Sequence, residues 1–159
     1  MKDDLGREIR EEAHLERLRT RNPRCQRCGN ERHPAALTGT APNIVCYECL
    51  LKESGRSWTE GHHPAGRHND PTTVAVPSND HRVLSDMQRD WPEQTLRNPD
   101  GSPLLAAAAA LRGWMDVMLI IIERTVDYIP AFLELLDQRL QEEWGDRWWE
   151  ELGLEGVKP

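Results

Sequence analysis

The sequence has no apolar stretch at its beginning, and it has few cysteines. The first twelve residues, MKDDLGREIREE, are charged and lack the apolar centre of a secretory signal peptide. We therefore expect a cytoplasmic protein, in which disulfides are rare and paired cysteines more often bind metal. The 159 residues contain only four cysteines and no internal repeat. These absences argue against a disulfide-stapled secreted fold and against a repeat architecture.

Charge is unevenly distributed along the chain. The formal net charge is −7, and residues 101–159 hold 11 acidic residues against 5 basic ones. Residues 17–32 are the opposite, with six arginines and one acid. A local basic patch can bind phosphate even in an acidic protein, although it can also be an ordinary solvated surface.

Composition changes divide the chain into four regions. Residues 1–22 are polar with sparse apolar positions, which predicts a surface helix over 3–20 that ends before Pro23. Residues 23–91 hold the cysteines and most of the histidines, and they include a β-like run at 72–76. We expect residues 92–102 to be a linker and residues 103–159 to be helical.

The tail begins with clear helix signals. Ser102 is a suitable N-cap, and Pro103 suits the first helical position. We predict a second helix from Pro130 and a short third helix from Asp146 to Leu152, with the first two forming a helical hairpin. In the first of these helices, apolar residues recur at spacings of four and three. We call this set the apolar seam: Leu104, Ala108, Leu111, Met115, Met118 and Ile122.

The seam has two interpretations, and both can hold. The hairpin can pack on the rest of the chain, or residues 103–145 can form a homodimer as a four-helix bundle. A membrane span over 104–122 is disfavoured, because Arg112 and Asp116 interrupt it and each costs about 2.5–3.5 kcal/mol at a helix centre.

The four cysteines predict one structural zinc site. They follow the pattern C-x2-C-x17-C-x2-C, with Gly29 after the first pair. Two such pairs complete a tetrahedral shell of four sulfurs, which leaves no position for water and indicates a structural role. A redox C-x-x-C is the weaker interpretation, because no βαβ pattern surrounds it. The predicted zinc ligands are Cys25, Cys28, Cys46 and Cys49.

Four of the six histidines lie within twenty residues. His62 and His63 are adjacent and precede Pro64, and His81 follows the β-like run in the sequence Asn-Asp-His. Neutral imidazole binds transition metals and can act as a general base near neutral pH. His68 lies in the loop between them.

The order of these residues resembles the HNH endonuclease family over roughly residues 56–88, or 25–88 with the cysteine pairs. The resemblance implies an α+β fold: a small zinc-bound ββα-metal (HNH/treble-clef-like) module followed by the α-helical hairpin tail. It implies that His62 and His81 bind a divalent metal, Mg²⁺ or another, and that His63 is the general base.

The chain departs from the family pattern at three places. Thr72 or Thr73 stands where the family has its middle Asn, and Ser85 stands where a second helix His often follows. Both cysteine pairs also precede the histidine pair. The residues that could support the site instead are Asn69, Thr73, Asn79, Asp80, Arg67 and Arg82.

Three functions remain open at this point. The leading one is hydrolysis of nucleic-acid phosphodiester bonds, with DNA preferred over RNA as substrate; Arg67 or Arg82 would hold a phosphate. The second is a non-catalytic zinc-binding module on an HNH-like scaffold that binds nucleic acid or a protein. The third is a regulatory or assembly protein whose work is done by the tail, with a membrane surface as one setting. Whether the chain is an enzyme is therefore not decided by its sequence.

Overall fold

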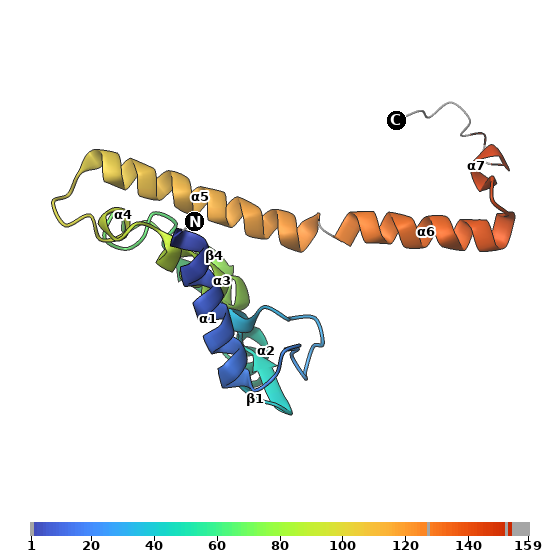
Figure 1. Cartoon of the computed structure of the whole chain (residues 1–159), viewed down its shortest axis with the longest axis horizontal. Helices are drawn as coiled ribbons and strands as arrows, with labels where there is room; N and C mark the ends of the chain where they lie inside the picture. Colours follow the sequence, from blue (N-terminus) through green and yellow to red (C-terminus); the bar gives the residue numbers. More distant parts are fainter. Residues whose placement is uncertain (1, 127, 152, 154–159) are drawn as a thin grey trace. The chain divides into compact units, whose positions relative to one another are not determined.

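The computed structural model describes residues 2–126, 128–151 and 153. The chain divides into two compact units, one up to residue 118 and one from residue 119 onward. Figure 1 colours the elements along the chain. The predicted mixed fold is confirmed at the level of helices with two small antiparallel sheets.

The first unit opens with helix α1 (Lys2–Leu18), close to the predicted 3–20. The helix ends where Arg19 takes a positive φ of 54°, and Leu18 is fully buried. The Arg17 guanidinium donates a 2.9 Å hydrogen bond to the Leu37 carbonyl. These contacts fasten α1 to the start of the first sheet.

The first sheet is a hairpin of β1 (Leu37–Thr40) and β2 (Asn43–Cys46), preceded by the 3-10 turn η1 (Pro34–Ala36). Gly39 has a φ of +90°, and a Cβ there would collide with the Asn43 carbonyl, so the turn requires glycine. Helix α2 (Tyr47–Glu53) follows β2 directly. The core beside this hairpin consists of Leu18, Cys25, Leu37, Ile44 and Cys46.

The second sheet is a hairpin of β3 (Thr59–His62) and β4 (Val74–Pro77), in which His62 pairs with Val74. The predicted strand at 72–76 starts two residues later, because Asp70 accepts a 2.7 Å hydrogen bond from the Thr72 N–H and holds a turn there. Helix α3 (Ser78–Met87) contacts this hairpin, and Val83 and Leu84 are among its buried residues.

The predicted linker at 92–102 contains structure. After the 3-10 turn η2 (Gln88–Asp90), helix α4 (Glu93–Arg97) ends at Asn98, which is left-handed and buried. Asn98 Oδ1 accepts a 2.8 Å hydrogen bond from the Ser102 N–H. Short polar segments of this kind fold when side chains such as Asn98 satisfy the backbone groups at their ends.

Helix α5 (Pro103–Thr125) begins at Pro103, as predicted. Its inward face in the first unit holds small residues, with Ala109 fully buried. Gly113 lies so close to the Pro64 carbonyl that a Cβ would overlap it. Asp116 accepts a 3.0 Å hydrogen bond from the buried Trp91 indole. Residues 103–118 therefore belong with the first unit rather than with the rest of the tail.

The second unit contains α6 (Tyr128–Trp144) and α7 (Trp148–Glu151). Helix α6 begins two residues before the predicted Pro130, and Trp148 donates a 2.9 Å hydrogen bond to Asp137. The predicted end of the last helix, Leu152, lies outside the described residues. The pairing of the two long helices as a hairpin stays a prediction.

Within the part of the chain that the structure describes, one stretch is long and apolar enough to cross a membrane by length and composition. It runs from Pro103 to Trp144 and has a mean hydropathy of 1.8 in its most apolar window. The core helix of a soluble protein meets the same criterion, so this feature alone does not define a membrane span.

Candidate metal centre

The four cysteines lie together, as the sequence predicts. Their sulfur atoms are all within 4.8 Å of one another. The Cys25 and Cys49 sulfurs are 3.9 Å apart, and those of Cys28 and Cys46 are 4.0 Å apart. A tetrahedral zinc site with Zn–S bonds of about 2.3 Å has sulfur–sulfur edges of about 3.8 Å. The spacing therefore suits one zinc ion held by four thiolates.

Two different local structures supply these ligands. Cys25 and Cys28 occupy a turn after α1, where the Gly29 N–H donates to the Cys25 carbonyl at 3.0 Å and Gly29 has a φ of +70°. Cys46 ends strand β2, and Cys49 lies in the first turn of α2. The Cys46 N–H also lies 3.3 Å from the Cys25 sulfur and links the two ligand pairs.

The surroundings of the cysteines shift the pKa values of their thiols in different directions. Burial alone would raise the pKa of Cys25, but backbone N–H groups of Cys28, Cys46 and Arg27 outweigh it and lower the pKa to about 6. Burial raises the pKa of Cys46 and of Cys49. Of these three, Cys25 is therefore the thiol that ionises most readily near neutral pH, and a bound metal would favour deprotonation of Cys46 and Cys49.

Asn79 connects this centre to helix α3. It is buried, and its Oδ1 accepts a 3.1 Å hydrogen bond from the Glu48 N–H at the start of α2. Its side chain also stabilises the Cys46 thiolate by a hydrogen bond. Asn79, proposed above as a support of the histidine site, thus serves the cysteine site. Asp80 follows it, half-buried, in the first turn of α3.

His62 and His81 face each other between β3 and α3. Their ring centroids are 5.5 Å apart and the rings are nearly perpendicular. Burial, together with the positive charges that His81 and His63 can carry, lowers the pKa of His62 to about 4. Burial likewise lowers the pKa of His81, although Glu60 opposes this. Both imidazoles are therefore neutral at pH 7.

Two polar residues that contact this pair were not predicted from the sequence. Glu60 Oε2 lies 2.9 Å from His81 Nδ1, and Gln88 Nε2 lies 3.4 Å from His62 Nε2. The Gln88 amide also donates to the His63 carbonyl at 2.8 Å. Spacing could have found both residues, because Glu60 is two positions before His62 on β3 and Gln88 follows the end of α3, seven positions after His81.

His63, the predicted general base, is half-buried. Its Nδ1 atom is buried and has no hydrogen-bond partner among the described residues. The loop that follows it turns sharply, since the Gly66 N–H donates to the His63 carbonyl at 2.9 Å. This ring nitrogen is therefore free to accept a proton, but it has almost no contact with solvent.

The remaining predicted support residues have other partners or lie at the surface. Asn69 donates to the Ala65 and Thr95 carbonyls at 3.0 and 2.9 Å and so ties its loop to α4. Arg82 pairs with Glu60 at 3.2 Å and stacks over Tyr47. The side chains of Arg67 and Thr73 are exposed.

Within residues 2–126, 128–151 and 153, the four cysteines form the single group in which three or more Cys, His, Asp or Glu side chains converge as metal ligands. The histidine pair lacks a converging third ligand of these types. The arrangement therefore fits structural zinc and does not support the predicted catalytic Mg²⁺.

The basic patch at 17–32 is largely engaged within the protein. Arg27 pairs with Glu53 at 3.2 Å, and Arg21 pairs with Glu12. Arg24 donates to the Gly29 carbonyl, next to the cysteine turn. Together with Arg17, which binds the Leu37 carbonyl, four of the six arginines have intramolecular partners. Their availability for phosphate is correspondingly reduced.

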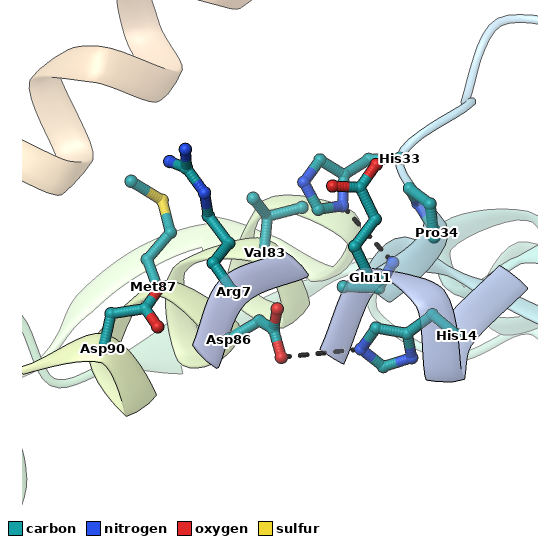
Figure 2. Close-up of a pocket in the computed structure, with 10 residues that line it drawn as sticks. Arg7, Glu11, His14, His33, Pro34, Val83, Asp86, Met87 and Asp90 are labelled. Atoms are coloured by element: carbon teal, nitrogen blue, oxygen red, sulfur yellow. Dashed lines mark hydrogen bonds and ion pairs between the residues drawn. The ribbon is translucent and has the colours of Figure 1, made fainter. Parts of the chain in front are cut away.

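A separate small pocket lies where α1 meets η1 and α3 (Figure 2), with a volume of about 110 Å³. His14 on α1 lies 3.5 Å from Asp86 on α3, and His33 accepts a 3.3 Å hydrogen bond from the Ala35 N–H. Arg10 also pairs with Asp86 at 3.6 Å. These polar contacts hold α1 against α3.

Comparison with known proteins adds no identity. No protein family, no curated protein and no solved structure matches the chain.

Proposed function

We propose that this chain is a zinc-stabilised binding module that presents an apolar helix to a protein partner, and that it does not itself catalyse a reaction. The observation that supports this proposal is that α5 has one packed face and one exposed apolar face. Gly113 and Asp116 hold its inner face against the first unit, while Leu111 and Met115 on the apolar seam are 69% and 65% exposed.

The proposed scaffold is of the HNH/treble-clef type. A cysteine turn, a hairpin and the first turn of a helix surround the four sulfurs, in the order that a treble clef has. The second hairpin and α3 then follow in ββα order, with His62 at the strand end and His81 on the helix. This order supports the resemblance that the sequence suggests.

Binding is favoured over catalysis by the surroundings of the histidines. The Gln88 amide lies against the His62 ring nitrogen that a metal would use, and the Glu60 carboxylate is shared by His81 and Arg82. A catalytic metal needs several converging ligands and an open position for water. Two histidines alone meet this requirement poorly.

A protein partner is favoured over nucleic acid by the exposed surfaces. Most large exposed apolar side chains of the described residues lie on α5 and α6, and contiguous apolar surface of this kind marks an interaction site. The tail around it is acidic, and of the six arginines of the basic patch two pair with carboxylates and two donate to backbone carbonyls. Acidic surface repels the phosphate backbone.

The proposal is tested by placing a photo-crosslinking amino acid at Leu111 in the chain expressed in its native cells. Leu111 lies on the seam, and the matched control position is Arg67, an exposed residue of the loop after the histidine pair. We expect protein adducts at position 111 and none at 67. Lipid adducts alone, or equal labelling at both positions, would contradict a protein-binding seam.

A metal-dependent endonuclease is the second candidate, favoured by the facing rings of His62 and His81 and by the uncommitted Nδ1 of His63. In this function His62 and His81 would hold a divalent metal, which supplies charge stabilisation to a phosphodiester, and His63 would take a proton from the attacking water. Both DNA and RNA remain possible substrates.

Incubation with supercoiled plasmid, single-stranded DNA and RNA in Mg²⁺ or Mn²⁺ decides between the two candidates. The proposed binding function predicts no cleavage by the wild type. Cleavage that is lost in His63→Ala, with zinc content unchanged, would establish the nuclease instead.

A further inference from the structure

We infer that the partner of the apolar seam is a second copy of this chain, which pairs seam to seam along α5 and α6. This inference rests on the proposed binding function and names its partner. The starting point is the exposure of the seam: Leu104 is 81% exposed, Met118 54% and Ile122 49%. Each of these side chains is exposed within the described residues.

The spacing of the seam is that of a coiled coil. In α5 its residues alternate at steps of four and three, which is the heptad pattern of helices that pair in water. In α6 the same alternation recurs at Ile129, Leu133, Leu136 and Leu140. Val126 lies four residues after Ile122 and three before Ile129, so the apolar spacing is kept in the sequence between the two helices.

The length of the pattern exceeds what chance spacing in a surface helix gives. In α5 the repeat covers residues 104–122, and in α6 it covers residues 129–140. A sustained apolar repeat of this period is typical of coiled coils. Each repeat position carries an apolar residue, without a charge at any of them. Pairing of two identical seams therefore brings no like charges together in the interface.

Lipid is a poor occupant of the same surface. The face of α5 opposite the seam is held by the Pro64 carbonyl and the Trp91 indole, so lipid cannot surround this part of the helix while those contacts last. A helix lying on a membrane usually has a polar face rich in Lys and Arg. Here residues 101–159 carry 11 acids against 5 bases.

Two leucines of α6 provide a matched pair for the test. Leu133 lies on the seam and Leu135 lies off it, about 200° around the helix. Both are 55% exposed, and α6 has no buried residues, so a substitution at either position removes no core contact. A charge in a coiled-coil interface is costly, whereas a charge on a solvated face is not.

The experiment is sedimentation equilibrium of the full zinc-loaded chain over a concentration series. We expect a mass twice the 18.3 kDa of one chain. Leu133→Glu should raise the dissociation constant at least about tenfold, equivalent to about 1.4 kcal/mol, and Leu135→Glu should leave it unchanged. Zinc content and far-UV circular dichroism confirm that both variants fold.

The outcomes separate this inference from the function on which it rests. A monomer at all concentrations, or equal weakening by both substitutions, overturns self-pairing through the seam. If that monomer still forms crosslinks at position 111 to a different protein, the proposed function stands without this partner. If it instead floats with phosphatidylcholine vesicles and crosslinks only to lipid, both are overturned.

Discussion

The cysteine centre and the histidine pair are built on similar local structure but reach different degrees of completeness. In each, one residue ends a strand and another lies in the first turn of a helix: Cys46 and Cys49 in one, His62 and His81 in the other. In the cysteine centre four sulfur atoms converge. In the histidine pair, by contrast, Gln88 contacts the His62 ring and Glu60 contacts the His81 ring. The difference lies in the neighbouring side chains rather than in the backbone.

The two sites are therefore expected to contribute differently to the stability of the chain. Four thiolates at tetrahedral spacing stabilise a small fold by binding metal, because the site does not exist in the unfolded chain. Two neutral imidazoles with polar neighbours can be stable without a metal. We therefore expect the first centre to control folding and the second to affect stability mainly through protonation.

The largest expected effect comes from breaking the cysteine centre. Cys46→Ser, or removal of zinc with a strong chelator, should unfold the first unit, because structural zinc contributes about 10–16 kcal/mol in zinc-finger peptides at pH 7. Zinc content by atomic absorption and helix content by circular dichroism are the measurements. His62→Gln is the control and should keep its zinc. A Cys46→Ser chain that stays folded without metal would show the centre to be dispensable.

Protonation of His62 should make the free energy of unfolding depend on pH. Since the pKa of His62 is about 4 in the folded chain and 6.5 for an unperturbed histidine, the unfolded chain binds more protons between these values. The free energy of unfolding should therefore fall as pH drops from about 6.5 to 4, by about 3 kcal/mol from this residue. Above pH 6.5 the contribution is constant.

Urea denaturation at several pH values measures this contribution as the difference between wild type and His62→Gln. Loss of zinc in acid affects both chains and cancels in the difference. His68→Gln, which changes an exposed histidine, should follow the wild-type curve. Identical curves for wild type and His62→Gln would mean that His62 is not buried in its neutral form.

The smallest effect concerns the connection between the two regions. Asn79→Ala removes the acceptor of the Glu48 N–H at the start of α2, and an unsatisfied buried group costs about 1–3 kcal/mol. It should also lower zinc affinity modestly, because the hydrogen bond to Cys46 is lost. Competition with a zinc chelator measures this change. Asn69→Ala, which loses hydrogen bonds to Ala65 and Thr95, should reduce stability without changing zinc affinity.

Sequence spacing was sufficient for features that depend on local chemistry. The cysteine group, the α1 boundaries and the start of α5 at Pro103 follow from ligand spacing and helix-end preferences, which act over a few residues. The short strand before α3 was also placed within two residues. In each case the determining interactions lie close together in the chain.

The structural features that were not predicted from the sequence have a common physical origin, because they depend on contacts between distant segments. The inner face of α5 was hard to predict because it approaches the first unit through Ala109 and Gly113, which carry little hydrophobic signal. The helix in the predicted linker is held by Asn69, which donates to the Thr95 carbonyl, and Asn79 serves a sulfur site that is remote in sequence. A pattern read along one segment does not contain these partners.

The contact between Gly113 and Pro64 has a mechanical consequence. The glycine lets the α5 backbone rest directly on the carbonyl of the residue after His62 and His63, with no side chain to act as a spacer. Any residue larger than glycine at position 113 would therefore push α5 away from the loop that follows the histidine pair. The distance between the seam-bearing helix and that loop is set by the absence of a single side chain.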